Sequence, residues 1–275
     1  MHQHNRLRLR RRLLLLRCLP AVATLAGCAS ERDAIMWSAR TSAPLPAAPA
    51  ITADGSVLSD TLLSLAGRVT PPSQPVCAGS LRLARAGAAL YGVWWSPRPD
   101  SGARLLAARS TDGGRSWGVP SPVDTVDRAV TGCRREAPSI AADVASGYVH
   151  VAYALLAPEG GGLFFSHSMD NGATFHSPVA LVYGERLGRT SVAASGDVVV
   201  VAFEDPNGRR PQIGVALSHT MGHIFEQRLL PLSDDNGIAS HPLAAVDGHR
   251  IAVGWEQRAT DGAPPAIVVR AGALP

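Results

Sequence analysis

The sequence contains two stretches of one pattern, Ser110-Thr-Asp-Gly-Gly-Arg-Ser-Trp117 and Ser168-Met-Asp-Asn-Gly-Ala-Thr-Phe175. Both read Ser-x-Asp-x-Gly-x-Ser/Thr-aromatic, which is turn chemistry: the aspartate can accept hydrogen bonds from nearby backbone amides, and the glycine can adopt a positive φ angle. The final aromatic ring can fill an apolar gap between two strands. The positions that carry the pattern are Ser110, Asp112, Gly114 and Trp117 in the first stretch and Ser168, Asp170, Gly172 and Phe175 in the second.

These turns belong to a longer repeat that occurs in four copies. In each copy an apolar strand ends in an aromatic residue, and a second apolar strand ends 15 residues further on. The third copy keeps part of the turn but has Thr220 in place of aspartate, and the fourth stops before a turn could be completed. The aromatic residues and the ends of the second strands are Trp95 and Ser110, Tyr153 and Ser168, Phe203 and Ser218, and Trp255 and Arg270.

Each copy has room for four short strands. The four aromatic residues are separated by 58, 50 and 52 residues, which is the size of one β-propeller blade. A helical pattern of comparable length does not occur. We therefore predict an all-β chain, with strands in the second copy over 139–144, 148–155, 162–168 and 177–182, and in the third over 191–194, 198–204, 212–218 and 226–230.

The turn pattern resembles the Asp-box, or BNR repeat, of the sialidase-like β-propellers, and the resemblance covers residues 77–275. It implies a propeller with about four visible four-stranded blades, either incomplete or closed by an N-terminal strand. In that family the boxes lie at the blade periphery, away from the substrate end. The resemblance thus implies a structural role for Asp112 and Asp170 rather than a catalytic one.

The segments that lead into the first strand of each copy carry charges that would face a propeller centre. In the sialidase-like family this face holds three arginines for the substrate carboxylate, a Tyr/Glu nucleophilic pair and an aspartate acid/base. The sequence offers no third arginine in a matching context, and only four copies are visible. We therefore expect a binding or assembly module without catalysis, with an exo-alpha-sialidase-like glycoside hydrolase as the alternative and no catalytic residue assigned. The candidate binding face consists of Arg134, Arg135, Glu136, Glu185, Arg189 and His241.

Two cysteines occupy equivalent positions in neighbouring copies. Cys77 and Cys133 each precede a first strand and are 56 residues apart. An oxidising envelope compartment permits a disulfide, and first strands near a propeller axis could bring the two residues together. We expect a disulfide, the alternative being two separate buried thiols.

The N-terminus has the order of a secretory signal: an arginine-rich stretch, an apolar run and small residues. It ends in Leu25-Ala-Gly-Cys28, which resembles the lipobox of bacterial lipoproteins and implies cleavage before Cys28 and lipidation of its thiol. Removing residues 1–27 removes six arginines and changes the net charge from +4 to −2. The resemblance implies an outer-membrane anchor facing the periplasm. The expected divisions are a signal peptide at 1–27, a lipidated N-terminus and Pro/Ala-rich tether at 28–55, a candidate closing strand at 56–76 and the propeller at 77–275.

Composition excludes several classes of function. The chain contains no lysine, which excludes Schiff-base chemistry. The slightly acidic mature chain has no basic stripe interleaved with aromatic residues, so no nucleic-acid partner is expected. Histidines and methionines at 167–176 and 219–223 would suit copper, but exposed turn residues need no ligand to explain them. We expect no metal and no cofactor. The expected partners are the membrane, through the lipid anchor, and an unidentified envelope protein or glycan.

Overall fold

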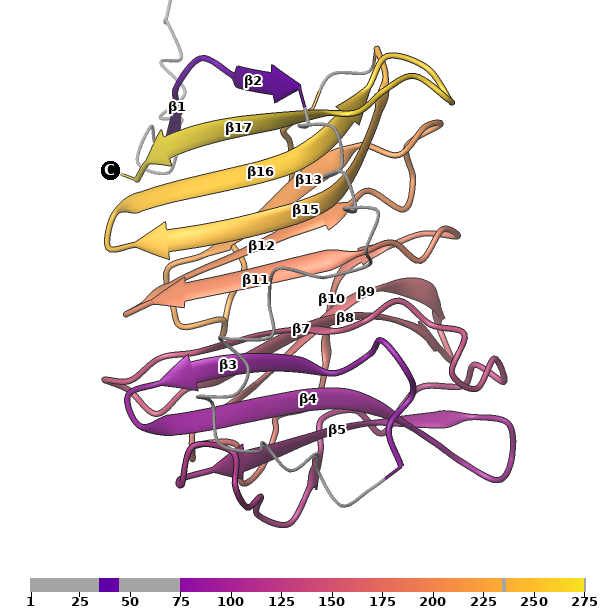
Figure 1. Ribbon diagram of the computed structural model, residues 1–275, viewed down its shortest axis with the longest axis vertical. Coiled ribbons are helices and arrows are strands. Elements are labelled where there is room, and N and C mark those ends of the chain that lie inside the picture. The colour runs from indigo at the N-terminus through magenta and orange to yellow at the C-terminus, as the bar shows by residue number, and fades with distance from the viewer. Residues whose placement is uncertain (1–34, 45–74, 234–235, 275) are drawn as a thin grey trace, which may run out of the picture. The chain divides into compact units, whose positions relative to one another are not determined.

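The described part of the chain consists of β-strands and turns. The computed structural model describes residues 35–44, 75–233 and 236–274, and within these residues no helix is long and apolar enough to cross a membrane. Four antiparallel sheets have the strand orders β3-β4-β5-β6, β10-β9-β8-β7, β11-β12-β13-β14 and β1-β17-β16-β15, and β2 also pairs with β17 (Figure 1). The strand bounds are β1 (Met36–Trp37), β2 (Thr41–Pro44), β3 (Arg82–Ala86), β4 (Ala89–Pro97), β5 (Ala103–Ser110), β6 (Ser121–Pro122), β7 (Ser139–Ala142), β8 (Val149–Ala157), β9 (Gly160–Ser168), β10 (Val179–Tyr183), β11 (Thr190–Ser195), β12 (Val198–Glu204), β13 (Ile213–Ser218), β14 (Gln227–Pro231), β15 (Ile238–Asp247), β16 (Arg250–Arg258) and β17 (Ala266–Ala273).

The sheets follow one another in chain order. The first strands β3, β7 and β11 contact each other in sequence, and β11 also packs against β15 of the fourth sheet. Figure 1 shows the four sheets arranged one after another along its vertical axis. Neighbouring first strands and face-to-face packing of four-stranded sheets are features of propeller blades. The predicted all-β, propeller-like class is therefore confirmed.

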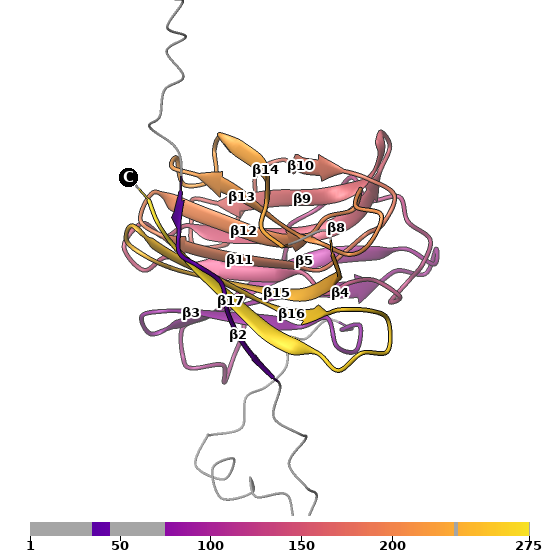
Figure 2. The same cartoon turned by 90° about the horizontal axis from the view of Figure 1, so that it is seen from above.

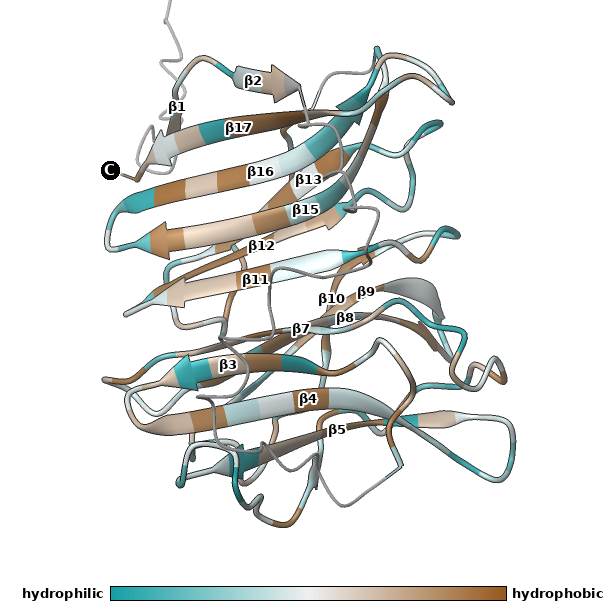
Figure 3. Cartoon of the chain, in the orientation of Figure 1, coloured by the Kyte–Doolittle hydropathy of each residue, from teal (hydrophilic) through white to brown (hydrophobic). Residues whose placement is uncertain are grey.

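The middle strands are buried on both faces. In β8, Val151 and Tyr153 share a cluster with Trp95 of the first sheet, whereas Ala152 on the opposite face packs in a cluster with Phe203 of the third sheet. The rings of Trp95 and Tyr153 meet edge to face, with centroids 6.3 Å apart. Strands covered on both faces read as continuous apolar runs, and in Figure 3 much of the hydrophilic colour lies in connections and at strand ends.

The 15-residue interval that occurs within each copy does not correspond to a constant strand register. The serine that opens each turn pairs across the ladder with a residue four positions before an aromatic residue. By this register the residue equivalent to Tyr153 is Trp94 rather than Trp95, so the predicted alignment of the first copy is wrong by one position. The pairs, each with its aromatic residue, are Leu90–Ser110 with Trp94, Val149–Ser168 with Tyr153, and Val199–Ser218 with Phe203.

The two predicted turns make the same hydrogen bonds. Asp112 Oδ1 accepts the Ser110 hydroxyl at 2.8 Å and the Ser116 amide at 2.9 Å. Ser110 Oγ in turn accepts the Gly114 amide at 2.8 Å, and Gly114 has a φ of +86°. The carboxylate is thus occupied within its own turn. In the second turn the same three distances are 2.7 Å for Ser168 Oγ to Asp170 Oδ1, 2.9 Å for the Thr174 amide to Asp170 Oδ1, and 2.8 Å for the Gly172 amide to Ser168 Oγ.

These hydrogen bonds favour the ionised aspartates. The Ser116 hydroxyl and amide, followed by the Ser110 hydroxyl, lower the pKa of Asp112. Burial would raise the pKa of Asp170, but the hydrogen bonds from Thr174 and Ser168 outweigh it and lower the pKa to about 2. The pKa of an aspartate in an unfolded chain is about 3.9. Because the folded pKa lies below the unfolded one, the stabilisation is present above about pH 4 and is lost as the pH falls through the folded pKa.

We predict that Asp112→Asn and Asp170→Asn each reduce the loss of unfolding free energy that occurs on acidification. The parent should lose stability as the pH falls below about 4, because the aspartates of the unfolded chain take up protons there while those of the folded chain remain ionised. Each variant should be less stable than the parent at pH 7 and lose less on acidification. Urea unfolding at several pH values measures this, with Asp261→Asn in the β16–β17 turn as the control. A variant that loses as much unfolding free energy on acidification as the parent would contradict the lowered pKa of the replaced aspartate.

The outer edge of the fourth sheet is formed by residues from the N-terminal side of the repeats. β1 pairs Met36 with Ala273, and β2 pairs Thr41 with Val269, both antiparallel to β17. Figure 2 shows β2 running along β17. The prediction of a tether at 28–55 is therefore wrong for residues 36–44, whose backbone completes the sheet by hydrogen bonding. The predicted closing strand at 56–76 lies outside the described residues except for its last two positions.

The predicted disulfide between Cys77 and Cys133 is present, with the two Cα atoms 5.2 Å apart. Cys77 is buried beside β4, where its amide donates to the Trp95 carbonyl at 2.8 Å. Cys133 belongs to the connection between β6 and β7. The bridge therefore joins the segment before the first sheet to the segment before the second.

Candidate functional site

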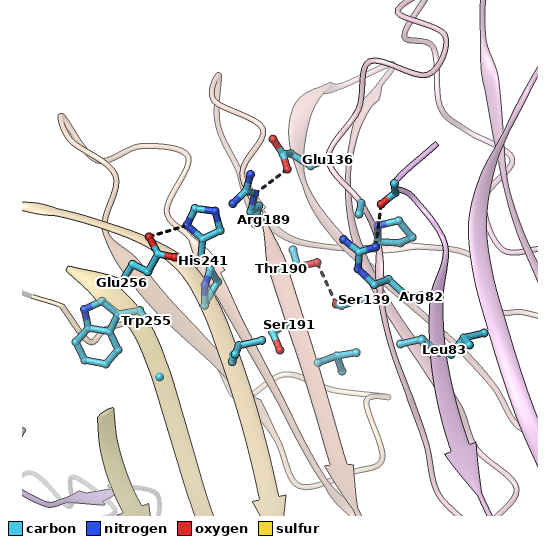
Figure 4. Close-up of a pocket in the computed structure, with 18 of the residues that line it drawn as sticks. Arg82, Leu83, Glu136, Ser139, Arg189, Thr190, Ser191, His241, Trp255 and Glu256 are labelled. Carbon is cyan, nitrogen blue, oxygen red and sulfur yellow. Dashed lines mark hydrogen bonds and ion pairs between the residues drawn. The ribbon is translucent and has the colours of Figure 1, made fainter. Parts of the chain in front are cut away.

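The segments that lead into the four first strands converge on one cleft. Its volume is about 900 Å³, and residues of all four sheets line it. Figure 4 shows their side chains gathered around this space. Four of the six residues predicted for the binding face line the cleft, namely Arg135, Glu136, Arg189 and His241.

Arg135 is a structural residue of the cleft wall. Its side chain is only 5% exposed and forms an ion pair with Asp127, which is 4% exposed. The remaining guanidinium donors reach the carbonyls of Gly132 and Ala129 at 2.8 and 2.7 Å, and the guanidinium lies 4.7 Å from the centre of a Trp95 ring. With its charge neutralised by Asp127 and with each of its three nitrogens donating one hydrogen bond, Arg135 holds the β6–β7 connection. Arg135 therefore lines the cleft as a residue that is already held by these contacts.

Glu136 and Arg189 form a pair at the mouth of the cleft. Arg189 Nε donates to Glu136 Oε2 at 3.1 Å, and the side chains are 43% and 40% exposed. Glu136 precedes the second sheet and Arg189 precedes the third, so the pair joins two lead-in segments. Because both groups remain accessible to solvent, an incoming ligand can exchange partners with either one.

Glu204 fixes two lead-in segments from behind the cleft. Its Oε2 accepts the Arg189 amide at 3.2 Å, and its Oε1 accepts the His241 amide at 3.0 Å. Gly188 permits this approach, because a Cβ there would lie 2.7 Å from the Glu204 Cβ. One carboxylate at the end of β12 thereby sets the spacing of Arg189 and His241 across the third and fourth sheets. Sequence reasoning missed Glu204, since it is the last residue of a strand and does not precede a first strand.

His241 sits in an irregular part of β15. The pairing of β15 with β16 shifts register between Ser240 and Leu243, and His241 has a φ of +56°. Its Nδ1 lies 3.6 Å from Glu256 Oε2 and 3.1 Å from the Ser240 hydroxyl. The bulge aims the imidazole at the carboxylate of Glu256, which also lines the cleft.

Arg82 is the cleft arginine that sequence analysis missed. It stands on β3 at the opposite side of the cleft from His241 (Figure 4). Its Nη1 donates to the carbonyls of Gly79 and Leu81 at 2.8 and 2.9 Å, and it pairs with no carboxylate among the described residues. Sequence analysis considered the segments that precede the first strands, whereas Arg82 is the first residue of β3. The signal that could have found Arg82 is its position at the start of a first strand. Thr190, which also lines the cleft, has the same position in β11.

Arg134 and Glu185 do not line the cleft. They border a second cavity of about 640 Å³, which also touches Arg135 and Glu136. The predicted binding face is therefore divided between two neighbouring depressions. Within the described residues, no three histidine, cysteine, aspartate or glutamate side chains are arranged as metal ligands.

No protein-family model and no curated protein matches the sequence. Solved structures match the fold at low identity. A protein of unknown function from Dyadobacter fermentans is 16% identical, with a TM-score of 0.50, and the match covers 68% of this chain and 50% of that one. A Trypanosoma rangeli sialidase is 12% identical (TM-score 0.48, covering 65% and 34%), and an alpha-L-arabinofuranosidase from Fusarium graminearum is 14% identical (TM-score 0.46, covering 67% and 59%). The matches span between 34% and 59% of the length of these three proteins.

Proposed function

We propose that this protein is a lipid-anchored β-propeller of the bacterial cell envelope that binds a ligand in the cleft between its four lead-in segments and catalyses no reaction. One observation carries the proposal: four segments far apart in the sequence place charged side chains around a single cleft of about 900 Å³. A cleft of this size with a few convergent polar groups is the default location of a ligand site.

The charges of the cleft favour a glycan with an acidic group. Arg82 is exposed and contacts no carboxylate among the described residues, which leaves it ready for an anion. The Glu136–Arg189 and His241–Glu256 pairs offer acceptors and donors suited to hydroxyl groups. A ligand that carries both carboxylate or sulfate and several hydroxyls uses all three features.

Glycoside hydrolysis is the second candidate, because two carboxylates line the same cleft. Glycosidases use an acid and a carboxylate on opposite sides of the scissile bond, and Glu136 and Glu256 come from different sheets. Both are already held, Glu136 by Arg189 at 3.1 Å and Glu256 by His241 at 3.6 Å. This pairing suits residues that orient a ligand, which is why binding is the leading proposal.

A panel of sialylated, uronate-bearing, sulfated and neutral glycans tests the two functions together. The proposal expects binding of acidic glycans over neutral ones, with no release of sugar after prolonged incubation. Turnover that disappears in Glu136→Gln or Glu256→Gln would show that the protein is a glycoside hydrolase and would contradict the non-catalytic binding module. Failure to bind any member of the panel would remove glycans as the ligand class.

The lipid anchor rests on Leu25-Ala-Gly-Cys28, whose small residues before cysteine suit cleavage and acylation. A diacylated cysteine holds a protein at a membrane because each buried methylene contributes about 0.8 kcal/mol. The parent should fractionate with membranes, whereas Cys28→Ala should not be acylated. Labelling of Cys28→Ala by a lipid precursor at the parental level would contradict the anchor.

A further inference from the structure

Four histidines and a tyrosine gather where the second sheet meets the third. His150 on β8 and His167 on β9 are direct cross-strand partners. His176 follows the second turn, and its amide donates to the His167 carbonyl at 2.9 Å. His223 comes from the incomplete third turn, where its Nε2 lies 3.1 Å from the Tyr148 hydroxyl. Two turns more than 40 residues apart in the sequence thus bring their histidines to one place.

Three ring nitrogens in this cluster lack hydrogen-bond partners. They are both nitrogens of His150 and Nε2 of His167, in side chains that are 0% and 5% exposed. A buried polar atom without a partner costs about 1–3 kcal/mol, and such atoms point to a water or an ion.

The spacing of three of the rings suits a shared ion. The ring centroids lie 4.6 Å apart for His167 and His176, 4.5 Å for His167 and His223, and 6.3 Å for His176 and His223. An ion bound to an imidazole nitrogen at about 2.1 Å lies about 3.2 Å from the ring centre, so two ligands of one ion have centroids at most about 6.4 Å apart. All three distances fall within this limit.

The rings must turn before their nitrogens can meet. His167 and His176 are stacked with an angle of 17° between their planes, and in this arrangement no group of three histidine, cysteine, aspartate or glutamate side chains among the described residues could hold a metal ion. His176 and His223 are exposed, whereas His167 is buried. Rotation of the two exposed rings about their terminal side-chain bonds, which is a soft motion, would aim their nitrogens at the unpartnered Nε2 of His167.

We propose that His167, His176 and His223 bind one divalent transition-metal ion at the border of the second and third sheets. Imidazole is a preferred ligand of zinc, copper and nickel, and for a site of this kind the affinity for Cu²⁺ exceeds that for Zn²⁺. The ion would join a turn of the third sheet to β9 of the second. These three residues do not line the cleft, so the proposal does not depend on the proposed ligand binding there.

Titration of the metal-free, untagged full chain with Cu²⁺ and with Zn²⁺ tests the proposal. Calorimetry should show one site that is lost in a His176→Ala, His223→Ala double variant, with each single substitution weakening Cu²⁺ binding about tenfold or more. His249→Ala is the matched control, since it removes an exposed histidine at the β15–β16 turn. His2 and His4 occur in every protein compared, so the signal is the difference between parent and variant.

Two further measurements, the melting temperature and the electron paramagnetic resonance spectrum, distinguish loss of metal binding from loss of folding. Saturating metal should raise the melting temperature of the parent and of His249→Ala but not that of the double variant, whose melting temperature in chelator should equal that of the parent. Electron paramagnetic resonance of the Cu²⁺-loaded parent should show three nitrogen ligands that are lost in the double variant. Equal stoichiometry, affinity and thermal shift in parent and double variant would overturn the proposal, and so would a parent that binds no metal beyond the His2 and His4 background.

Discussion

Replacement of both bridged cysteines, Cys77→Ser with Cys133→Ser, should lower the free energy of unfolding by about 4 kcal/mol. The bridge closes a loop between residues separated by 56 positions, and loop-closure entropy in the unfolded chain gives this magnitude. For a domain of this size the loss corresponds to a fall in melting temperature of roughly 8–16 °C. Urea denaturation of the double variant and the oxidised parent measures the difference.

Reduction of the parent provides the matching control for this prediction. The reduced parent and the double variant should have the same melting temperature, because both lack the cross-link and keep the same surrounding contacts. A double variant as stable as the oxidised parent would show that the bridge does not restrain the unfolded chain. A large difference between the reduced parent and the double variant would attribute the loss to packing around Cys77, which is 1% exposed.

Gly222→Ala should destabilise the protein by about 2–5 kcal/mol. Gly222 has a φ of +84°, which costs an alanine about 1–2 kcal/mol. A Cβ there would also lie 2.5 Å from Cζ of Phe165. Phe165 is fully buried and packs edge to face on Phe225 with ring centroids 4.9 Å apart, so it cannot retreat, and overpacking adds about 1–3 kcal/mol.

Gly262→Ala separates the two causes. Gly262 has nearly the same φ, +83°, and a Cβ there would meet nothing within 4 Å. It should therefore lose only the cost of the backbone conformation, about 1–2 kcal/mol. The excess loss in Gly222→Ala, measured by urea unfolding of both variants, reports the contact between the third turn and the second sheet. Equal losses in the two variants would contradict that contact.

Much of the fold follows from local sequence. The strand predicted at 198–204 agrees with β12, and that predicted at 139–144 overlaps β7, because apolar runs bounded by glycine turns leave few alternatives. The outer strands β1 and β2 were missed because 36–44 lacks an apolar β-branched run and contributes mainly backbone hydrogen bonds to β17. The first copy was misaligned by one position because Leu90 and Ser110, which pair across β4 and β5, are 20 residues apart, whereas the equivalent pairs in the second and third copies are 19 apart.

The cleft was predictable in part. Glu136, Arg189 and His241 were found because residues just before or near the start of the first strands of a propeller face its centre. The role of Arg135 was not predictable, since its neutralising partner Asp127 lies in an irregular connection whose path the sequence does not specify. The histidine cluster depends on packing between two sheets, so the local pattern at 167–176 indicated exposed turn residues where the structure buries His167.

A comparison of two arginines on one strand tests the central claim most directly. Arg82 and Arg85 are both exposed on β3, but Arg82 lines the cleft, whereas Arg85 donates to the Gly87 carbonyl at its own turn. The measurement is the dissociation constant of the tightest-binding acidic glycan of the panel for the parent, Arg82→Ala and Arg85→Ala. The account predicts a loss of about tenfold or more in Arg82→Ala and less than twofold in Arg85→Ala. Equal affinities in all three proteins would place binding elsewhere and contradict the cleft as the functional site.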